Sequence, residues 1–106
     1  KALTVLQKIL DDGAEPLMLL GLIANHYHRL SLAKELMSEG VERKEVARIM
    51  KLHPYKQEEF LANARRANGD KLSNSLKKIA KTDLAIKTSR ATPRLQIEML
   101  VYELSA

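Results

Sequence analysis

Three histidines, His26, His28 and His53, are the residues of this sequence with the widest chemical range. His26 and His28 flank a tyrosine inside a predicted helix, where a separation of two residues places them about 200° apart around the axis. Two metal ligands on one helix need a spacing of three or four residues, so these two imidazoles cannot share one ion. His53 has no carboxylate or second histidine close to it in the sequence. The spacing therefore predicts no metal site.

Other catalytic signatures are also missing from the sequence. The glycines stand singly, so there is no glycine-rich loop to hold a phosphate, and no serine lies in a nucleophile-elbow context. The absence of cysteine excludes disulfides and thiolate metal sites, and it fits a reducing cytosol. We therefore expect no catalytic residue, no cofactor and a cytoplasmic location.

Asp83 and Lys87 are a charged pair with a defined geometry. Asp83 interrupts the apolar stripe of a predicted helix over residues 70–88, and Lys87 follows one turn later, the favourable order for an acid and a base. The pair either fixes the start of the loop at 88–92 or orients Lys87 and Arg90 toward a partner, or it leaves Asp83 at the edge of the stripe with a hydrogen bond to a neighbouring helix, which is the favoured interpretation. We expect Asp83→Ala or Lys87→Ala to destabilise the domain more than a surface change does, because an unpaired buried charge is costly.

Residues 40–66 have the rhythm of a helix-turn-helix, with predicted helices over 42–51 and from residue 55 onward. A recognition helix presents donors at its amino-terminal end to DNA. Here Glu58 and Glu59 occupy that first turn, where they suit the helix dipole but would face the DNA phosphates. The favoured role of this pair is packing, and a DNA-binding regulator that uses residues 40–66 is the alternative.

Length and charge limit the remaining classes. The 106 residues predict one domain, and the net charge of +5, concentrated in residues 41–106, is as compatible with a nucleic-acid partner as with a solvated helical surface. The longest apolar run, residues 17–24, is shorter than the ~20 residues that cross a bilayer, so we expect no membrane association. The chain begins at a lysine, which suggests a piece of a longer protein.

The period of the apolar residues is helical throughout, which predicts an all-α fold: a compact bundle of five to six helices, with the helix-turn-helix-like pair at about 42–66. Glycines, prolines and Thr92 mark the helix ends. The predicted helices cover residues 2–11, 16–38, 42–51, 55–66, 70–88 and 93–104.

The second and the last predicted helix carry more apolar residues than one buried face requires. The first half of helix 16–38 is apolar nearly all round, which predicts burial on every side. Such helices need cover from a second protein as well as from the core. The candidate partner interface consists of Leu17, Leu20, Leu95, Met99 and Tyr102.

Three stretches together carry a resemblance over nearly the whole chain: LLGLIANHYHRLSLAKELMSEGV, EVARIMKLHPYKQEEFLANARR and LKKIAKTDLAIKTSRATPRLQIEMLVYEL. The chain resembles the carboxyl-terminal domain of the delta subunit of the bacterial DNA polymerase III clamp loader. The most specific pieces are the His-Pro-Tyr turn at 53–55 and the run at 83–88 that precedes Pro93. Lys51 departs from the pattern, because family members often have glycine at that position.

The resemblance implies an assembly role. The family's delta subunit resembles an AAA+ protein, its amino-terminal part opens the sliding clamp, and its last domain is a helical collar that packs with the ATPase subunits and delta-prime. Residues 1–106 are thus expected to be a single collar domain without the AAA+-like domains. The resembled parent is a non-catalytic subunit of the polymerase holoenzyme.

The resemblance also implies weak contact with DNA, because the family's ring encloses primer–template DNA. Lys87 and Arg90 are then candidate contacts to the DNA backbone. Such contacts position DNA and carry no sequence preference.

Overall fold

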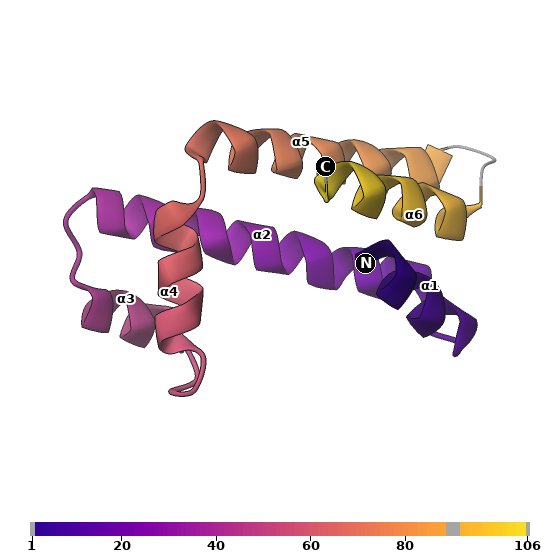
Figure 1. The fold of residues 1–106 in the computed structure, drawn as a ribbon. Helices are drawn as coiled ribbons and strands as arrows, with labels where there is room; N and C mark the ends of the chain where they lie inside the picture. Colours follow the sequence, from indigo (N-terminus) through magenta and orange to yellow (C-terminus); the bar gives the residue numbers. More distant parts are fainter. Residues whose placement is uncertain (1, 89–91, 106) are drawn as a thin grey trace. The chain divides into compact units, whose positions relative to one another are not determined.

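The computed structural model describes residues 2–88 and 92–105, and within these ranges every regular element is an α-helix (Figure 1). The predicted all-α class is confirmed. The helices are α1 (Ala2–Asp11), α2 (Pro16–Ser38), α3 (Arg43–Ile49), α4 (Gln57–Arg66), α5 (Gly69–Thr88) and α6 (Pro93–Leu104).

The helix-turn-helix-like pair is shorter than the sequence predicts. α3 ends at Ile49, and α4 begins at Gln57, two residues later than expected. Pro54 lies in a turn that is closed by the Lys56 amide, which donates to the His53 carbonyl at 2.9 Å. A turn of this kind has Pro favoured at its second position, and it delays the start of the helix.

Three helices end in the same hydrogen-bonded motif, in which a residue of positive φ follows the helix. In α2, Gly40 has φ +89° and donates to the Met37 carbonyl, while Val41 donates to the Leu36 carbonyl at 3.1 Å. Gly13 closes α1 in the same way with φ +101°. Glycine has no Cβ to strain this conformation.

Lys51 closes α3 in this motif without being glycine. Its φ is +53°, its amide donates to the Arg48 carbonyl at 3.2 Å, and Leu52 donates to the Ala47 carbonyl at 3.0 Å. A left-handed conformation costs a residue with a Cβ about 1–2 kcal/mol. Lys51 therefore closes α3 with the usual cap geometry although it replaces the glycine of the resembled family, and its backbone is strained as a result.

Two helices begin at side-chain caps. The Thr92 hydroxyl accepts from the Leu95 amide at 3.3 Å, with Pro93 at the first helical position, as predicted. Asn68 caps α5, since its side-chain oxygen accepts from the Lys71 amide at 3.0 Å. Both side chains satisfy amides that the first helical turn leaves unpaired.

The chain divides into two compact units. Unit 1 comprises Lys1–Ala24 and Ser75–Ala106, and unit 2 comprises Asn25–Asn74. Unit 1 therefore contains α1, the start of α2, most of α5 and α6, while unit 2 contains the rest of α2, α3, α4 and the start of α5.

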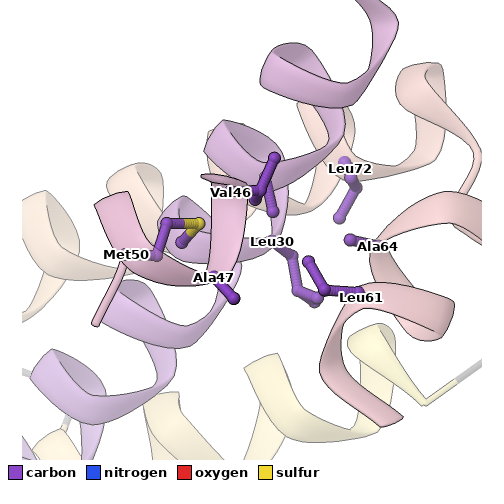
Figure 2. Packing of buried hydrophobic residues seen from close by; sticks show 8 residues of the cluster. Leu30, Val46, Ala47, Met50, Leu61, Ala64 and Leu72 are labelled. Carbon is purple, nitrogen blue, oxygen red and sulfur yellow. The ribbon is translucent and has the colours of Figure 1, made fainter. Parts of the chain in front are cut away.

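Unit 2 has a closed apolar core to which four helices contribute (Figure 2). Val46 and Ala64 are fully buried, and Leu61 is only 4% exposed. The phenol of Tyr27 packs against this core, and its burial raises the pKa of the group. The core cluster consists of Leu30, Ala33, Val46, Ala47, Met50, Leu61, Ala64 and Leu72.

Unit 1 is built on the contact between α1 and α6. Arg94 of α6 joins the two helices, because its Nη2 lies 2.7 Å from Asp11 of α1, and its Nε lies 3.7 Å from Glu98. The hydrogen bond with Asp11 raises the pKa of the Arg94 guanidinium. The buried apolar residues of this unit are Leu6, Leu10, Leu20, Ile79, Ile97, Leu100 and Val101.

Candidate interaction surfaces

Most of the large apolar side chains that remain exposed belong to unit 1. Such side chains are unremarkable when scattered, but a contiguous apolar patch marks a site of interaction. In unit 1 they are Val5, Ile9, Leu17, Met18, Leu22, Leu84, Leu95, Met99 and Tyr102, and in unit 2 they are Leu32, Ile49 and Tyr55.

Leu95, Met99 and Tyr102 form one line along α6, which we call the α6 stripe. They are 51%, 56% and 68% exposed, and their spacing of four and then three residues places them on one face of the helix. Ile97 and Leu100, which face the core of unit 1, lie on another side of the same helix. α6 is therefore apolar on two faces, one buried and one exposed.

An apolar depression of about 430 Å³ borders the α6 stripe. Leu3 of α1 and Met99 and Tyr102 of α6 contribute its apolar lining. Glu98 and Glu103 also line it, so carboxylates stand at the edge of an apolar surface. This arrangement suits a partner that presents apolar side chains beside a cation.

The amino-terminal half of α2 differs from the sequence-based predictions in two respects. Leu17, Met18 and Leu22 are exposed, so the helix is not buried on every side within the described chain. Leu20, predicted for the partner interface, is only 3% exposed and belongs to the core of unit 1. The sequence alone could not separate Leu20 from its neighbours, because every turn of this segment is apolar.

Gln96 contributes a buried polar atom next to the α6 stripe. Its Nε2 is buried and has no hydrogen-bond partner among the described residues. Gln96 lines a small depression of about 120 Å³ together with Lys81 and Thr82 of α5 and Met99 of α6. An amide nitrogen left in this state costs roughly 1–3 kcal/mol.

The pair of Asp83 and Lys87 is present, but not in the expected environment. Lys87 Nζ donates to Asp83 Oδ2 at 2.9 Å, and the two side chains are 64% and 45% exposed. The expectation that Asp83 is buried is wrong, since nearly half of its side chain is exposed. The expected hydrogen bond to a neighbouring helix is also wrong, because Asp83 pairs with Lys87 on its own helix. Arg90, the second predicted DNA contact, lies outside the described residues.

The helix-turn-helix-like pair is poorly suited to bind in a DNA groove. α3 has seven residues, and the exposed carboxylates Glu58 and Glu59 occupy the first turn of α4. Arg48 is engaged by Glu45, which accepts from its Nε at 3.0 Å, and this hydrogen bond lowers the pKa of the Glu45 carboxyl. Both helices instead contribute to the core of unit 2, as the favoured interpretation predicts.

The turn between α3 and α4 exposes a pair of stacked aromatic rings that the sequence analysis did not predict. His53 and Tyr55 stack with ring centroids 4.8 Å apart and planes 26° apart, and Tyr55 is 89% exposed. The spacing of His53 and Tyr55, two residues apart across Pro54, is a sequence signal that could have predicted the stack. The spacing of four between Met18 and Leu22 could likewise have added them to the predicted interface.

The other histidines do not combine into a site. His26 contacts Phe60 edge to face, with ring centroids 6.4 Å apart, and His28 is exposed. Among residues 2–88 and 92–105, no group of three or more His, Asp or Glu side chains is placed to hold a metal ion. None of the described helices is long and apolar enough to span a membrane.

Comparison with known proteins gives consistent matches. A family model described as "DNA polymerase III delta subunit, C-terminal domain" matches residues 1–104. The DNA polymerase III subunit delta of Bacillus subtilis (strain 168) is 23% identical over 104 residues, which make up 98% of this chain and 30% of that protein. The solved structure of the Bacillus subtilis DNA clamp loader delta protein matches with a TM-score of 0.82 and 24% identity, over 96% of this chain and 30% of that chain. The chain thus spans less than a third of either relative, and the structural match agrees with the helical fold.

Proposed function

The chain belongs to the family of carboxyl-terminal domains of the DNA polymerase III delta subunit, and on this premise we propose that it is an assembly domain of the replicative clamp loader. In this proposal it is the collar domain that packs with the ATPase subunits and delta-prime, so that the complex can load the sliding clamp onto primed DNA. The domain itself catalyses no reaction, and it acts in the cytoplasm. The sliding clamp is contacted by parts of the delta protein outside the matched region.

The observation that carries the proposal is the α6 stripe. An isolated domain gains nothing from leaving a leucine, a methionine and a tyrosine on one line of a helix in water, since each would contribute about 1.5–3 kcal/mol or less on burial. Tyrosine and methionine are enriched where proteins meet. The stripe has the spacing with which one helix packs against another.

The residues around the α6 stripe indicate which side chains a partner surface should present. Glu98 and Glu103 at the edge of the depression favour lysine or arginine on the partner. We therefore expect the partner to be a helix with apolar side chains on its buried face and a basic edge. Leu17, Met18 and Leu22 give α2 a second apolar surface for the same kind of contact.

Contact with primer–template DNA is the second part of the proposal. Lys87 has an exposed ammonium group that is held by Asp83, and Arg90 follows it in the sequence. Cations of this kind bind phosphates without sequence preference, and their contribution falls steeply as salt rises.

Binding to purified subunits tests the assembly role. The chain is immobilised, the clamp-loader ATPase subunits and delta-prime of the same organism are passed over it without DNA, and the dissociation constants are measured. We expect binding by the parent and strong loss for Met99→Glu, because a carboxylate on the stripe must be desolvated beside Glu98 and Glu103. A matched control is Ile49→Glu, which places the same charge on an exposed apolar residue of unit 2.

Two results would contradict the assembly role. One is the absence of binding to every subunit by a parent chain whose circular dichroism shows a folded helical protein. The other is equal affinity of the parent and Met99→Glu.

A further inference from the structure

Unit 2 contains a hollow of about 450 Å³ where the end of α2, the start of α3 and the end of α4 meet (Figure 1). We call it the basic hollow, and the side chains that give it its character are Lys34, Met37, Val41, Arg43 and Arg65. All of its lining residues belong to unit 2. Its volume is in the range of sites that bind ligands.

Met37 and Val41 are the large apolar side chains of the basic hollow. Both are half-buried and pack against the core cluster of unit 2. Val41 is also held by the motif that ends α2, in which its amide donates to the Leu36 carbonyl at 3.1 Å. Because this apolar surface is already ordered, packing a partner side chain on it costs little entropy. The flexible thioether of Met37 adapts to side chains of different shape.

Lys34, Arg43 and Arg65 place positive charge around these apolar residues. Among the described residues, no carboxylate lies within 4.0 Å of any of these three cations. Lys34 Nζ donates to the Arg65 carbonyl at 3.4 Å, which joins α2 to the end of α4. Glu42 is the one carboxylate in the described lining, so positive charge is in excess there. An excess of unpaired cations favours carboxylates on a partner.

The basic hollow is open to water along its edge. Arg43 and Arg65 are exposed, as are most of the other residues of the lining. Sites for small molecules bury most of the surface of the ligand, which an open hollow does not do. An open hollow instead receives one large side chain of a protein while neighbouring residues of that protein lie on its edge.

We propose that the basic hollow binds an acidic amphipathic segment of a partner protein. A leucine or aromatic side chain of the segment packs on Met37 and Val41, and carboxylates beside it pair with Arg43 and Arg65. The guanidinium group of arginine matches a carboxylate with two parallel hydrogen bonds, so two arginines on different helices also orient the segment.

This surface is distinct from the one that carries the proposed assembly role. Glu98 and Glu103 edge the depression at the α6 stripe, whereas Arg43 and Arg65 edge the basic hollow. The two surfaces therefore favour partners of opposite charge, and each disfavours the partner of the other. They also lie in different units, so the two proposals can fail separately.

Fluorescence anisotropy of the chain with labelled peptides tests the proposal. The probe is a helical peptide of about 14 residues, with leucine at every third or fourth position and glutamate at most others. One control peptide has serine in place of each leucine, and the other has lysine in place of each glutamate. At about 150 mM salt, where long-range attraction is screened, we expect the probe to bind at least about tenfold more tightly than either control.

Substitutions on α4 assign the binding to the basic hollow. Arg65→Glu is expected to weaken binding of the probe about tenfold or more, because the new carboxylate repels those of the peptide, and Arg65→Lys should retain most of the affinity. Arg66→Glu is the matched control, since it makes the same change in the same last turn of α4 at an exposed residue outside the lining. Arg65→Glu should also bind the lysine peptide more tightly than the parent does.

A second substitution guards against an effect on folding. Arg43→Glu makes the same charge reversal on α3 and should weaken the probe to a similar degree. Thermal melts of both variants like that of the parent establish that the fold is intact.

Four results would overturn the proposal. The first is absence of binding of the probe to the parent, and the second is equally tight binding of the serine peptide, which would leave only an attraction between charges. The third is an equal effect of Arg65→Glu and Arg66→Glu. The fourth is loss of the probe in Met99→Glu, which would place the peptide on the α6 stripe.

Discussion

The two units are both helical and each has a buried apolar core, but they differ in which apolar side chains they leave exposed to water. Unit 2 buries its core cluster and exposes few large apolar side chains, whereas unit 1 exposes many along α1, α2 and α6. The difference is clearest in single helices. α4 buries Leu61 and Ala64 and has polar or charged side chains at its exposed positions, while α6 carries apolar residues on two faces.

The comparison shows that apolar residues have two different environments in this chain. In unit 2 most of them hold a core together. In unit 1 they hold a core together and also remain exposed along α6, where we propose that a partner binds. A substitution in each unit can therefore separate stability from assembly, and the predictions below run from the largest expected effect to the smallest.

Leu61→Ala is expected to give the largest loss. It removes a side chain that is 4% exposed from the core of unit 2, so the free energy of unfolding should fall by about 2–5 kcal/mol in urea denaturation. Leu95→Ala in unit 1, at 51% exposure, should change it by about 0.5 kcal/mol or less. Similar losses for both variants would remove the distinction between the two units.

Tyr102→Ala is expected to affect assembly and leave stability nearly unchanged. A tyrosine at the centre of an interface contributes about 2 kcal/mol or more, so affinity for the clamp-loader subunits should fall about 30-fold. Calorimetric titration measures this loss. Tyr55→Ala, the corresponding change in unit 2, should retain full affinity. Equal weakening by both variants would place the interface on both units.

Lys51→Gly is expected to stabilise the chain by about 1 kcal/mol, because glycine adopts the positive φ at the end of α3 without strain. Gly40→Ala makes the opposite change at the equivalent position of α2 and should destabilise by a similar amount. No atom lies within 4 Å of a Cβ built at Gly40, so the loss would come from the backbone and not from a clash. Thermal melts of both variants give the comparison, and a lower midpoint for Lys51→Gly would show that the lysine side chain contributes more than the strain costs.

Asp83→Ala is expected to have the smallest effect. The pair with Lys87 is exposed, and such pairs on one helix contribute about 0.3–0.5 kcal/mol, less as salt rises. Denaturation at low and high salt measures this contribution, and Lys87→Ala, which removes the other partner of the pair, should give a similar loss. A loss comparable to that of Leu61→Ala would restore the expectation of a buried carboxylate.

The elements of the fold were predictable where local chemistry decides them. Thr92 and Pro93 fix the start of α6, and Gly13 and Gly40 fix the ends of α1 and α2, because caps and positive φ values depend on a few adjacent residues. The predicted start of α4 was two residues too early, since the turn at Pro54, closed by the Lys56 amide, holds residues 53–56 outside the helix.

The candidate sites were only partly predictable. Leu95, Met99 and Tyr102 were predicted for the interface and are exposed, but Leu20 is buried and Asp83 is not. The stacking of Tyr55 on His53 depends on how the turn closes. Periodicity shows that a helix has two apolar faces, and it does not show which one the chain itself covers.

The sequence by itself determined the helical class, most helix boundaries, the absence of cysteine chemistry and the family, because these depend on composition, period and motifs spread over the length of the chain. Only the tertiary structure decided which apolar residues reach water. Burial is a property of contacts between segments distant in sequence, such as the contact of α1 with α6. The local pattern of one helix is the same whether that helix packs on the chain's own core or on another protein.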